Sequence, residues 1–234
     1  MVNSQITHGF ILINKNTGIS SHTVVNKLRR ITGIRKIGHA GTLDPLASGL
    51  MILAIGREAT KKIDQYVKLD KEYIATLHLG AETDTYDREG NVVFCDKEFS
   101  ERKINQEIIE NILRNFVGPQ EQIPPMFSAK KVKGQRLYDL ARKGIEIERK
   151  ASKINIYKIE YISYEAPLLK IKIKCSSGTY IRSIAFDFGR ALGCGAYLEA
   201  LERTEIGKFR IEDSFLIEEL GEGNWEQKIL KNAL

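Results

Sequence analysis

The sequence predicts an α+β fold in which a mixed, mainly antiparallel central sheet is flanked by helices. Residues 168–175 alternate between apolar side chains and lysines, the pattern of a strand with one buried face and one solvated face. Segments with apolar residues at helical spacing stand between such strands, which favours interleaved helices and strands in one fold. The 234 residues are 42% hydrophobic, enough to bury a sizeable core.

The first third of the chain predicts three strands and two helices. Ser20 or Ser21 can cap a helix that carries Val24, Val25, Leu28 and Ile31 on one face and ends near Gly33. A second predicted helix turns Ala59, Ile63, Tyr66 and Val67 inward. The three predicted strands, which are short and apolar or alternating, cover residues 10–13, 50–55 and 73–79.

The remainder of the chain predicts a helix, a pair of long strands and a final helix. Asn105 is the expected cap of the first helix, with Ile104 and Ile109 as a hydrophobic staple. That helix is expected to bury Ile108, Ile112, Leu113 and Phe116. The strands cover residues 153–164 and 168–175, and the last helix carries Ile181, Ala185, Phe188 and Leu192 before Gly193 ends it.

Charge and cysteine usage narrow the class of protein. A net charge of +6 and a pI near 9.1 permit a polyanionic partner, although a slightly basic soluble protein without such a partner fits equally. Three widely spaced cysteines without a C-x-x-C pair argue against a zinc site or a disulfide framework and favour a reducing cytoplasm. No signal peptide is recognisable, and the longest apolar run, residues 50–55, is too short to cross a bilayer. We therefore expect a soluble, cytoplasmic protein that does not use a membrane.

Residues 38–50, GHAGTLDPLASGL, form the segment most suggestive of chemistry. Its glycines allow positive φ and close approach of a ligand, and Pro45 stiffens the chain behind Asp44. A carboxylate on a stiffened loop at the start of a strand is a common place for function. An Asx-turn, in which Asp44 only caps its neighbours, explains the same pattern. The residues alone leave both interpretations open.

The segment resembles the signature of the TruB family of pseudouridine synthases, and further motifs of that family follow in order. Together they cover most of the chain. They are residues 15–21 (KNTGISS), 71–73 (KEY), 83–90 (TDTYDREG), 122–130 (QIPPMFSAK), 134–138 (GQRLY), 178–182 (GTYIR) and 201–203 (LER). Asn16 departs from the family pattern, which usually has proline there, so the first turn is expected to be looser.

The resemblance implies an isomerase that converts uridine to pseudouridine in RNA, with U55 in the T-loop of tRNA as the expected target. The uridine is flipped out, and the nucleophile of the family corresponds here to Asp44, which attacks the ribose or assists departure of the base. The detailed path stays open. No cofactor or metal is expected, the partner is the T-stem-loop of tRNA, and the protein is expected to be a monomer.

The other motifs imply further site residues, each with a simpler alternative. Arg182 would pair with Asp44 and keep it ionised, unless it is a solvated helix residue. Tyr73 would stack on the target uracil and take part in proton transfer, although an aromatic residue on a strand is normally core. His39 would enter the T-loop in place of extruded bases, and Leu201 would pack on the flipped base; an ordinary polar residue and an ordinary core residue are the alternatives.

Lys15 would hold the pocket or serve structure only, and Asp87 would contact the T-loop or brace its own turn. Lys130, Arg136 and Arg142 belong to a basic stretch within a flap, about residues 124–144, that would bind phosphates over the T-loop. A charge run of this kind is otherwise a solvated face.

The expected domain plan is a catalytic domain over residues 1–210 and a short C-terminal tail, residues 211–234, too short for the complete PUA domain that bacterial members commonly carry. Three rival functions remain: an RNA chaperone without catalysis, a glycosidase that releases uracil, and the same chemistry on another RNA. A glycosidase usually pairs two carboxylates, and the matched motifs offer no second one.

Overall fold

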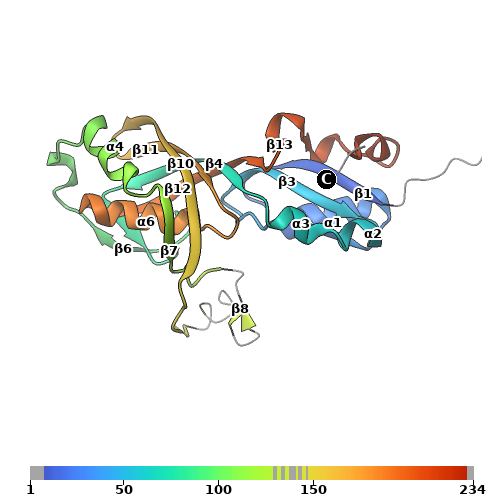
Figure 1. The fold of residues 1–234 in the computed structure, drawn as a ribbon, viewed down its shortest axis with the longest axis horizontal. Helices are drawn as coiled ribbons and strands as arrows, with labels where there is room; N and C mark the ends of the chain where they lie inside the picture. Colours follow the sequence, from blue (N-terminus) through green and yellow to red (C-terminus); the bar gives the residue numbers. More distant parts are fainter. Residues whose placement is uncertain are drawn as a thin grey trace, which may run out of the picture. The chain divides into compact units, whose positions relative to one another are not determined.

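Strands and helices alternate along the chain as the sequence predicts, and the computed structural model groups them into two units (Figure 1). It describes residues 8–128, 131–132, 135–136, 141, 144–145 and 147–230. Unit 1 consists of Met1–Lys71 and Glu202–Leu234, and unit 2 of Glu72–Leu201. The chain thus leaves unit 1 once and returns to it once.

Unit 1 is built on strands in the order β14-β1-β3-β12, with β2 added to β3 and β13 to β12. β1 and β3 are antiparallel, from Gly9 opposite Ile55 to Lys15 opposite Gly49, and the C-terminal end of β12 runs parallel to β3. The sheet is therefore mixed and mainly antiparallel, as predicted. The strand bounds are β1 Gly9–Lys15, β2 Ile37–His39, β3 Ser48–Ile55, β12 Ala196–Ile206, whose residues from Glu202 belong to unit 1, β13 Phe209–Arg210 and β14 Phe215–Leu216.

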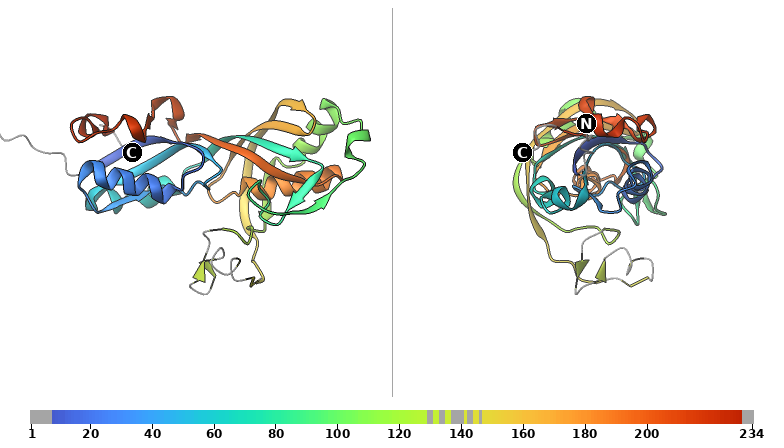
Figure 2. Two further views of the ribbon diagram at one scale, coloured as in Figure 1. Left: turned by 180° about the vertical axis from the view of Figure 1, so that it is seen from behind. Right: turned by 90° about the vertical axis from the view of Figure 1, so that its right-hand side faces the viewer.

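Helices α1 (Ser21–Thr32), α2 (Gly56–Thr60) and α3 (Ile63–Val67) lie along one face of β1 and β3 (Figures 1 and 2). The caps predicted for α1 are confirmed, because Ser20 accepts from the Thr23 N–H and Gly33 adopts the left-handed conformation. The core beneath these helices includes Phe10 and Tyr66, whose ring centres are 4.3 Å apart.

The prediction of one helix carrying Ala59, Ile63, Tyr66 and Val67 inward is wrong in part. The chain breaks after Thr60 and begins α3 at Ile63, which shifts the helical phase. Tyr66 is consequently buried, whereas Val67, at the end of α3, is 36% exposed.

The C-terminal segment after β13 contains no α-helix within its described residues up to 230. It forms 3-10 turns, η2 (Ile211–Asp213), η3 (Ile217–Glu219) and η4 (Trp225–Lys228), with β14 pairing in parallel with β1. Gly221 and Gly223 interrupt helical continuity here. Ile217 and Trp225 are buried, and the Leu230 N–H donates to the Phe10 carbonyl, so the segment packs on β1.

Unit 2 has the strand order β12-β4-β11-β10-β7. β11 confirms the predicted alternation, since Leu169, Ile171, Ile173 and Cys175 are buried and the lysines between them are not. The strands of this sheet are β4 Lys71–Leu79, β7 Gly118–Gln122, β10 Ser152–Glu165 and β11 Leu168–Cys175; the residues of β4 from Glu72 onward belong to unit 2. Two further antiparallel pairs lie outside the sheet. They are β5 Ala81–Thr83 with β6 Val92–Cys95, and β8 Lys131–Val132 with β9 Gln135–Arg136.

The helices of unit 2 whose bounds lie within the described residues are η1 (Phe99–Glu101), α4 (Gln106–Arg114) and α6 (Ile181–Leu192). Asn105 caps α4 as predicted, and Gly193 ends α6 as predicted. The predicted inward face of α4 is correct only in part: Leu113 is buried as predicted, and so is Ile109. Ile112 and Phe116 are half-buried, and Ile108 is 37% exposed. Residues four apart share a helix face, so the phase that buries Ile109 and Leu113 turns Ile108 toward solvent.

The three cysteines are free thiols; Cys175 and Cys194 are buried and Cys95, on β6, is exposed. None of the helices formed by the described residues is long and apolar enough to span a bilayer.

Gly49 allows the close approach of β3 and β12. Its φ is +104°, and a Cβ there would lie 2.6 Å from the Arg203 backbone nitrogen and against the Arg203 carbonyl oxygen. We predict that Gly49→Ala destabilises the protein by about 3 kcal/mol through backbone strain and overpacking. Gly33→Ala is the matched control, because its φ is +69° and no atom lies within 4 Å, so only about 1 kcal/mol of strain is expected. Urea unfolding measures both; equal losses would contradict the prediction.

Candidate active site

Asp44 lies on the loop between β2 and β3, and hydrogen bonds hold the residues on both sides of it. The Ser21 hydroxyl donates to the Leu43 carbonyl at 2.9 Å and accepts from the Leu43 N–H at 2.8 Å. The Pro45 carbonyl accepts from the Gly18 N–H at 2.8 Å. The loop is therefore fixed immediately before and after Asp44, which itself is half-buried.

The backbone of Asp44 also closes its turn, because its carbonyl accepts from the Ala47 N–H at 3.1 Å. This backbone bond shows that the turn does not depend on the carboxylate alone. The Asx-turn role and the catalytic role of Asp44 both stay predictions.

Lys15 ends β1 and has no exposed surface. Its Nζ donates to the carbonyls of Ile19 at 2.7 Å, Asn16 at 3.0 Å and Pro45 at 3.4 Å. A buried ammonium that satisfies three carbonyls fixes the turn after β1 against the residue that follows Asp44. This contact supports the structural alternative for Lys15, and a contact with substrate stays a prediction.

Arg203 supports the start of the same loop, a role that the sequence reasoning missed. The side chain is 1% exposed; Nε donates to the Leu50 carbonyl at 2.7 Å and Nη2 to the Gly41 carbonyl at 3.2 Å. Arg203 ends the motif at residues 201–203, which could have indicated its importance, but the motif does not indicate which residues its side chain contacts. The sequence indicates Ser21 only as a possible helix cap, whereas in the structure its hydroxyl holds Leu43.

His39 is on β2, opposite Leu53 of β3, and is half-buried. Burial lowers the pKa of the imidazole, and the positive charge of Arg203 lowers that pKa further, as does His22. The ring is therefore neutral near pH 7. Its Nδ1 is buried without a hydrogen-bond partner among the described residues, so its contribution to RNA binding stays a prediction.

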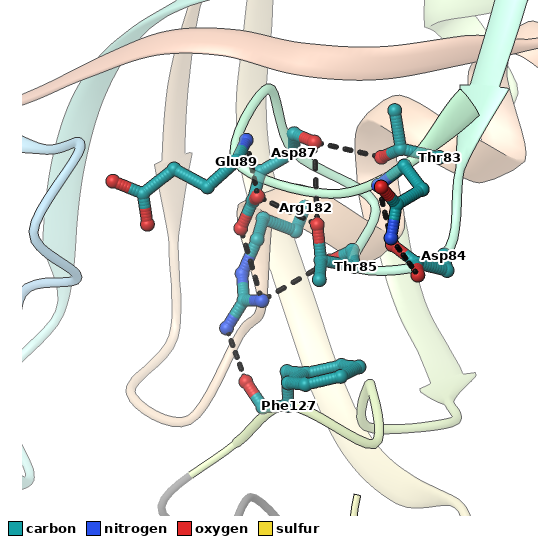
Figure 3. A network of polar contacts seen from close by, with 8 residues as sticks. Thr83, Asp84, Thr85, Asp87, Glu89, Phe127 and Arg182 are labelled. Carbon is teal, nitrogen blue, oxygen red and sulfur yellow. Dashed lines mark hydrogen bonds and ion pairs between the residues drawn. The ribbon is translucent and has the colours of Figure 1, made fainter. Parts of the chain in front are cut away.

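Arg182 is the centre of a polar network in unit 2 (Figure 3). Its guanidinium is held by the Asp87 carboxylate at 3.2 Å, the Thr85 carbonyl at 3.1 Å and the Phe127 carbonyl at 2.6 Å. Only 5% of Arg182 is exposed, which rules out the alternative of a solvated helix residue. Its pairing with Asp44, a residue of unit 1, stays a prediction.

Asp87 braces its own turn, one of the two alternatives that the sequence left open. Its Oδ1 accepts from the Thr85 hydroxyl at 2.7 Å and from the Glu89 N–H at 3.0 Å, and its Oδ2 faces Arg182. Thr83 adds a hydroxyl bond to the Asp87 carbonyl at 2.7 Å. Thr83, Thr85 and Asp87 thus form a turn that presents one carboxylate to Arg182. A contact with the T-loop stays a prediction for Asp87.

The structure gives the positions of Tyr73 and Leu201, but their surroundings do not indicate a role for either residue. Tyr73 is on β4 and 8% exposed, whereas Leu201 is on β12 and half-buried. Both positions are compatible with core packing and with a face reached by substrate, so their roles stay predictions.

The predicted flap is largely outside the described residues. Lys130 and Arg142 lie outside them, and of Arg136 only the backbone is described, on β9 opposite Lys131 of β8. Within the described part of the chain, no group of three or more His, Cys, Asp or Glu side chains could hold a metal ion.

The structure therefore brings the candidate residues together in two groups, one in each unit. Lys15, Ser21 and Arg203 fix the loop of Asp44, and Asp87 fixes Arg182.

Comparisons with known proteins agree with the motifs. Residues 29–181 match the profile of the TruB family pseudouridylate synthase N-terminal domain, and residues 182–234 match that of the tRNA pseudouridylate synthase B C-terminal domain. The chain is 47% identical to tRNA pseudouridine synthase B of Francisella philomiragia, covering 97% of this chain and 74% of the relative. It is 48% identical to the enzyme of the same name from Protochlamydia amoebophila, covering 96% and 84%.

Solved structures give the same fold. A crystal structure of a Cbf5–Nop10–Gar1 complex superimposes with a TM-score of 0.69 at 27% identity, over 90% of this chain. An H/ACA RNP bound to a substrate RNA containing 2′-deoxyuridine gives a TM-score of 0.64 at 26% identity, also over 90% of this chain. The chain spans about half the length of these solved chains, 52% and 51%.

The lowered pKa of His39 predicts a pH dependence of stability. The unfolded chain binds a proton on this imidazole near its ordinary pKa of about 6.5, whereas the folded chain binds it only at lower pH. Stability is therefore lost as the pH falls through about 6.5. We expect the wild type to lose more unfolding free energy than His39→Asn between about pH 7.5 and pH 5.5. Parallel curves from urea unfolding at each pH would contradict this expectation.

Proposed function

The chain belongs to the TruB family of pseudouridine synthases, and from this membership we propose that it isomerises uridine 55 in the T-loop of tRNA. The chain is a tRNA pseudouridine synthase, an isomerase that converts uridine to pseudouridine. Uridine 55 as the specific target is supported by the sequence similarity to tRNA pseudouridine synthase B, which extends over nearly the whole of this chain.

The reaction moves the uracil on its own sugar. The N1–C1′ bond breaks, the base rotates, a C5–C1′ bond forms, the proton at C5 leaves and N1 ends protonated. We propose that Asp44 is the nucleophile: its carboxylate attacks C1′ of the flipped nucleotide or assists departure of the uracil. Because nothing but this nucleotide is rearranged, the scheme needs no co-reactant.

The main support for this assignment is the set of hydrogen bonds that hold the Asp44 loop in place. Ser21 holds Leu43, and Gly18 and Lys15 hold Pro45, so the backbone on either side of the carboxylate is set before the substrate arrives. A nucleophile gains most when its position is set in advance, because a displacement of about 1 Å can cost a factor of about 100 in rate.

We propose that Arg182 pairs with Asp44 and keeps it ionised. A guanidinium has five donors in one plane, so it can serve Asp87 and a second carboxylate at once. The network around Asp87, Thr85 and Phe127 supports this role, since it fixes the plane of the guanidinium. An ion pair offsets the rise in carboxylate pKa that burial causes.

The remaining contacts to RNA follow from the family motifs. Tyr73 stacks on the flipped uracil, Leu201 packs against it, and neutral His39 occupies the space that the extruded bases leave. Lys15 supports the Asp44 loop, and Asp87 supports Arg182. The flap with Lys130, Arg136 and Arg142 binds backbone phosphates of the T-stem-loop.

We further propose that the protein acts as a cytoplasmic monomer, with residues 1–210 as the catalytic domain and residues 211–234 as a short tail. The packing of the described part of the tail on β1 supports its role as a part of the catalytic fold.

The proposed nucleophile predicts a strong effect for an isosteric change. Asp44→Asn keeps the shape of the side chain but removes the charged nucleophile, so pseudouridine formation should fall by more than about 10⁴-fold. Binding of tRNA should be retained. Single-turnover conversion and filter binding of the same transcript measure the two quantities. Asp64→Asn, on the exposed face of α3, is the matched control and should convert at the wild-type rate.

The outcomes separate the rival functions. Conversion by Asp44→Asn at the wild-type rate would disprove the mechanism. Release of free uracil by the wild type would indicate a glycosidase, and tRNA binding without any conversion would indicate a chaperone.

If Arg182 pairs with Asp44 as proposed, a positive charge at position 182 is not sufficient for full turnover. Arg182→Lys keeps the positive charge but loses the planar set of donors, so turnover should fall roughly 100-fold while tRNA affinity changes little. Arg210→Lys, at an exposed position of β13, is the control. An equal loss of turnover and affinity would reject the assignment of Arg182 to the chemical step.

A further inference from the structure

Helix α6 presents one stripe of side chains, four residues apart, to β5 and the turn that follows it. The stripe is Arg182, Phe186 and Arg190, and residues at this spacing share one face of a helix. Each member of the stripe contacts a different residue of β5 or of that turn, and the helix and the contacted residues run in opposite directions. The contacts are Arg182 with Asp87 at 3.2 Å, Phe186 with Tyr86 at 4.1 Å between ring centres, and Arg190 with Glu82 at 3.4 Å.

Tyr86 has an unusual backbone for its side chain. Its φ is +64°, and among the described residues it is the one non-glycine residue with positive φ. The left-handed region is sterically unfavourable for a bulky residue, and glycine or asparagine is expected there. The ring of Tyr86 stacks on Phe186 with an angle of 19° between the planes, and the Arg190 guanidinium carbon lies 4.4 Å from the Phe186 ring centre. This stack stabilises the unfavourable backbone.

The position of Tyr86 connects the stack to Arg182. Tyr86 stands between Thr85 and Asp87, whose carbonyl and carboxylate both hold the guanidinium. Phe186 follows Arg182 by one helical turn, a rise of about 6 Å along α6. The turn and the helix are therefore joined at two points. Backbone hydrogen bonds hold the same turn to β12, because the Leu198 N–H donates to the Tyr86 carbonyl and the Leu198 carbonyl accepts from the Arg88 N–H, both at 3.0 Å. On the side of α6, the ring stack adds a second contact to those of Arg182.

We propose that Tyr86 and Phe186 are positioning residues: their ring stack fixes the Thr85–Asp87 turn on α6 and thereby aims the Arg182 guanidinium. The proposal rests on the proposed function, in which Arg182 serves the catalytic carboxylate. Neither ring touches the reacting atoms in this scheme, and both act through Arg182.

Tyr86→Gly tests the proposal without adding strain. Glycine tolerates the positive φ, so the substitution removes the ring while relieving the backbone. We expect the single-turnover rate at saturating tRNA to fall roughly 10- to 100-fold, because a guanidinium displaced by a fraction of an ångström aims poorly. The Kd for tRNA should be unchanged. Tyr86→Phe should restore the wild-type rate, since the stack uses the ring and not the hydroxyl.

The partner ring provides an independent arm. Phe186→Leu should slow the reaction as much as Tyr86→Gly does, and the double variant should be no slower than either one, because both changes remove the same stack. Phe116→Leu is the matched control: it loosens another aromatic contact of α6, Phe116 with Phe188 at 6.3 Å, on a different part of the helix. It should leave the rate unchanged.

Two results would overturn the proposal. A raised Kd for tRNA with an unchanged saturated rate would make Tyr86 an RNA contact, and a Tyr86→Phe variant as slow as Tyr86→Gly would show that the ring stack is not the cause. A wild type that formed no pseudouridine would instead refute the proposed function, and the proposal with it.

Discussion

The buried ion pair between Arg182 and Asp87 is the interaction on which the polar side of the candidate site depends. Both side chains are almost without exposed surface, so neither is solvated by water. Removing one partner of such a pair costs about 3–5 kcal/mol, because the other charge is left buried alone. The pair survives because each group has further partners: two carbonyls for the arginine, a hydroxyl and an amide for the aspartate. A charge held this firmly is pre-organised for electrostatic work.

In unit 1, hydrogen bonds to backbone groups take the place of the ion pair. The carboxylate of Asp44 stands on irregular chain, where no ladder of strand hydrogen bonds fixes it. Its neighbours are held instead by one hydroxyl, one amide and one ammonium, from Ser21, Gly18 and Lys15. Loops gain precision when side chains from regular elements hold them, and here β1 and the first turn of α1 supply the anchors.

Much of the fold could be predicted from the sequence, because alternation and capping are local signals. The lysine alternation of β11 and the caps of α1, α4 and α6 were read correctly. The errors occurred where helical phase depends on a break or on packing, as at Val67 and Ile108. The motifs identified the candidate residues of the site. Contacts between residues far apart in the sequence, such as Arg182 with Asp87 or Arg203 with Gly41, produce no periodic pattern from which they could be predicted. The sequence gives no sign of the positive φ of Tyr86, because tyrosine is not a residue type expected in that conformation.

The distribution of the thiols has a practical consequence. Cys175 and Cys194 are sealed in the core, whereas Cys95 stands exposed on β6, paired with the strand that leads into the Asp87 turn. A maleimide dye added to the unaltered folded chain will therefore react at this single surface sulfur. Its emission will report on the hairpin next to the Arg182 network as the enzyme meets its substrate, with no cysteine introduced or deleted.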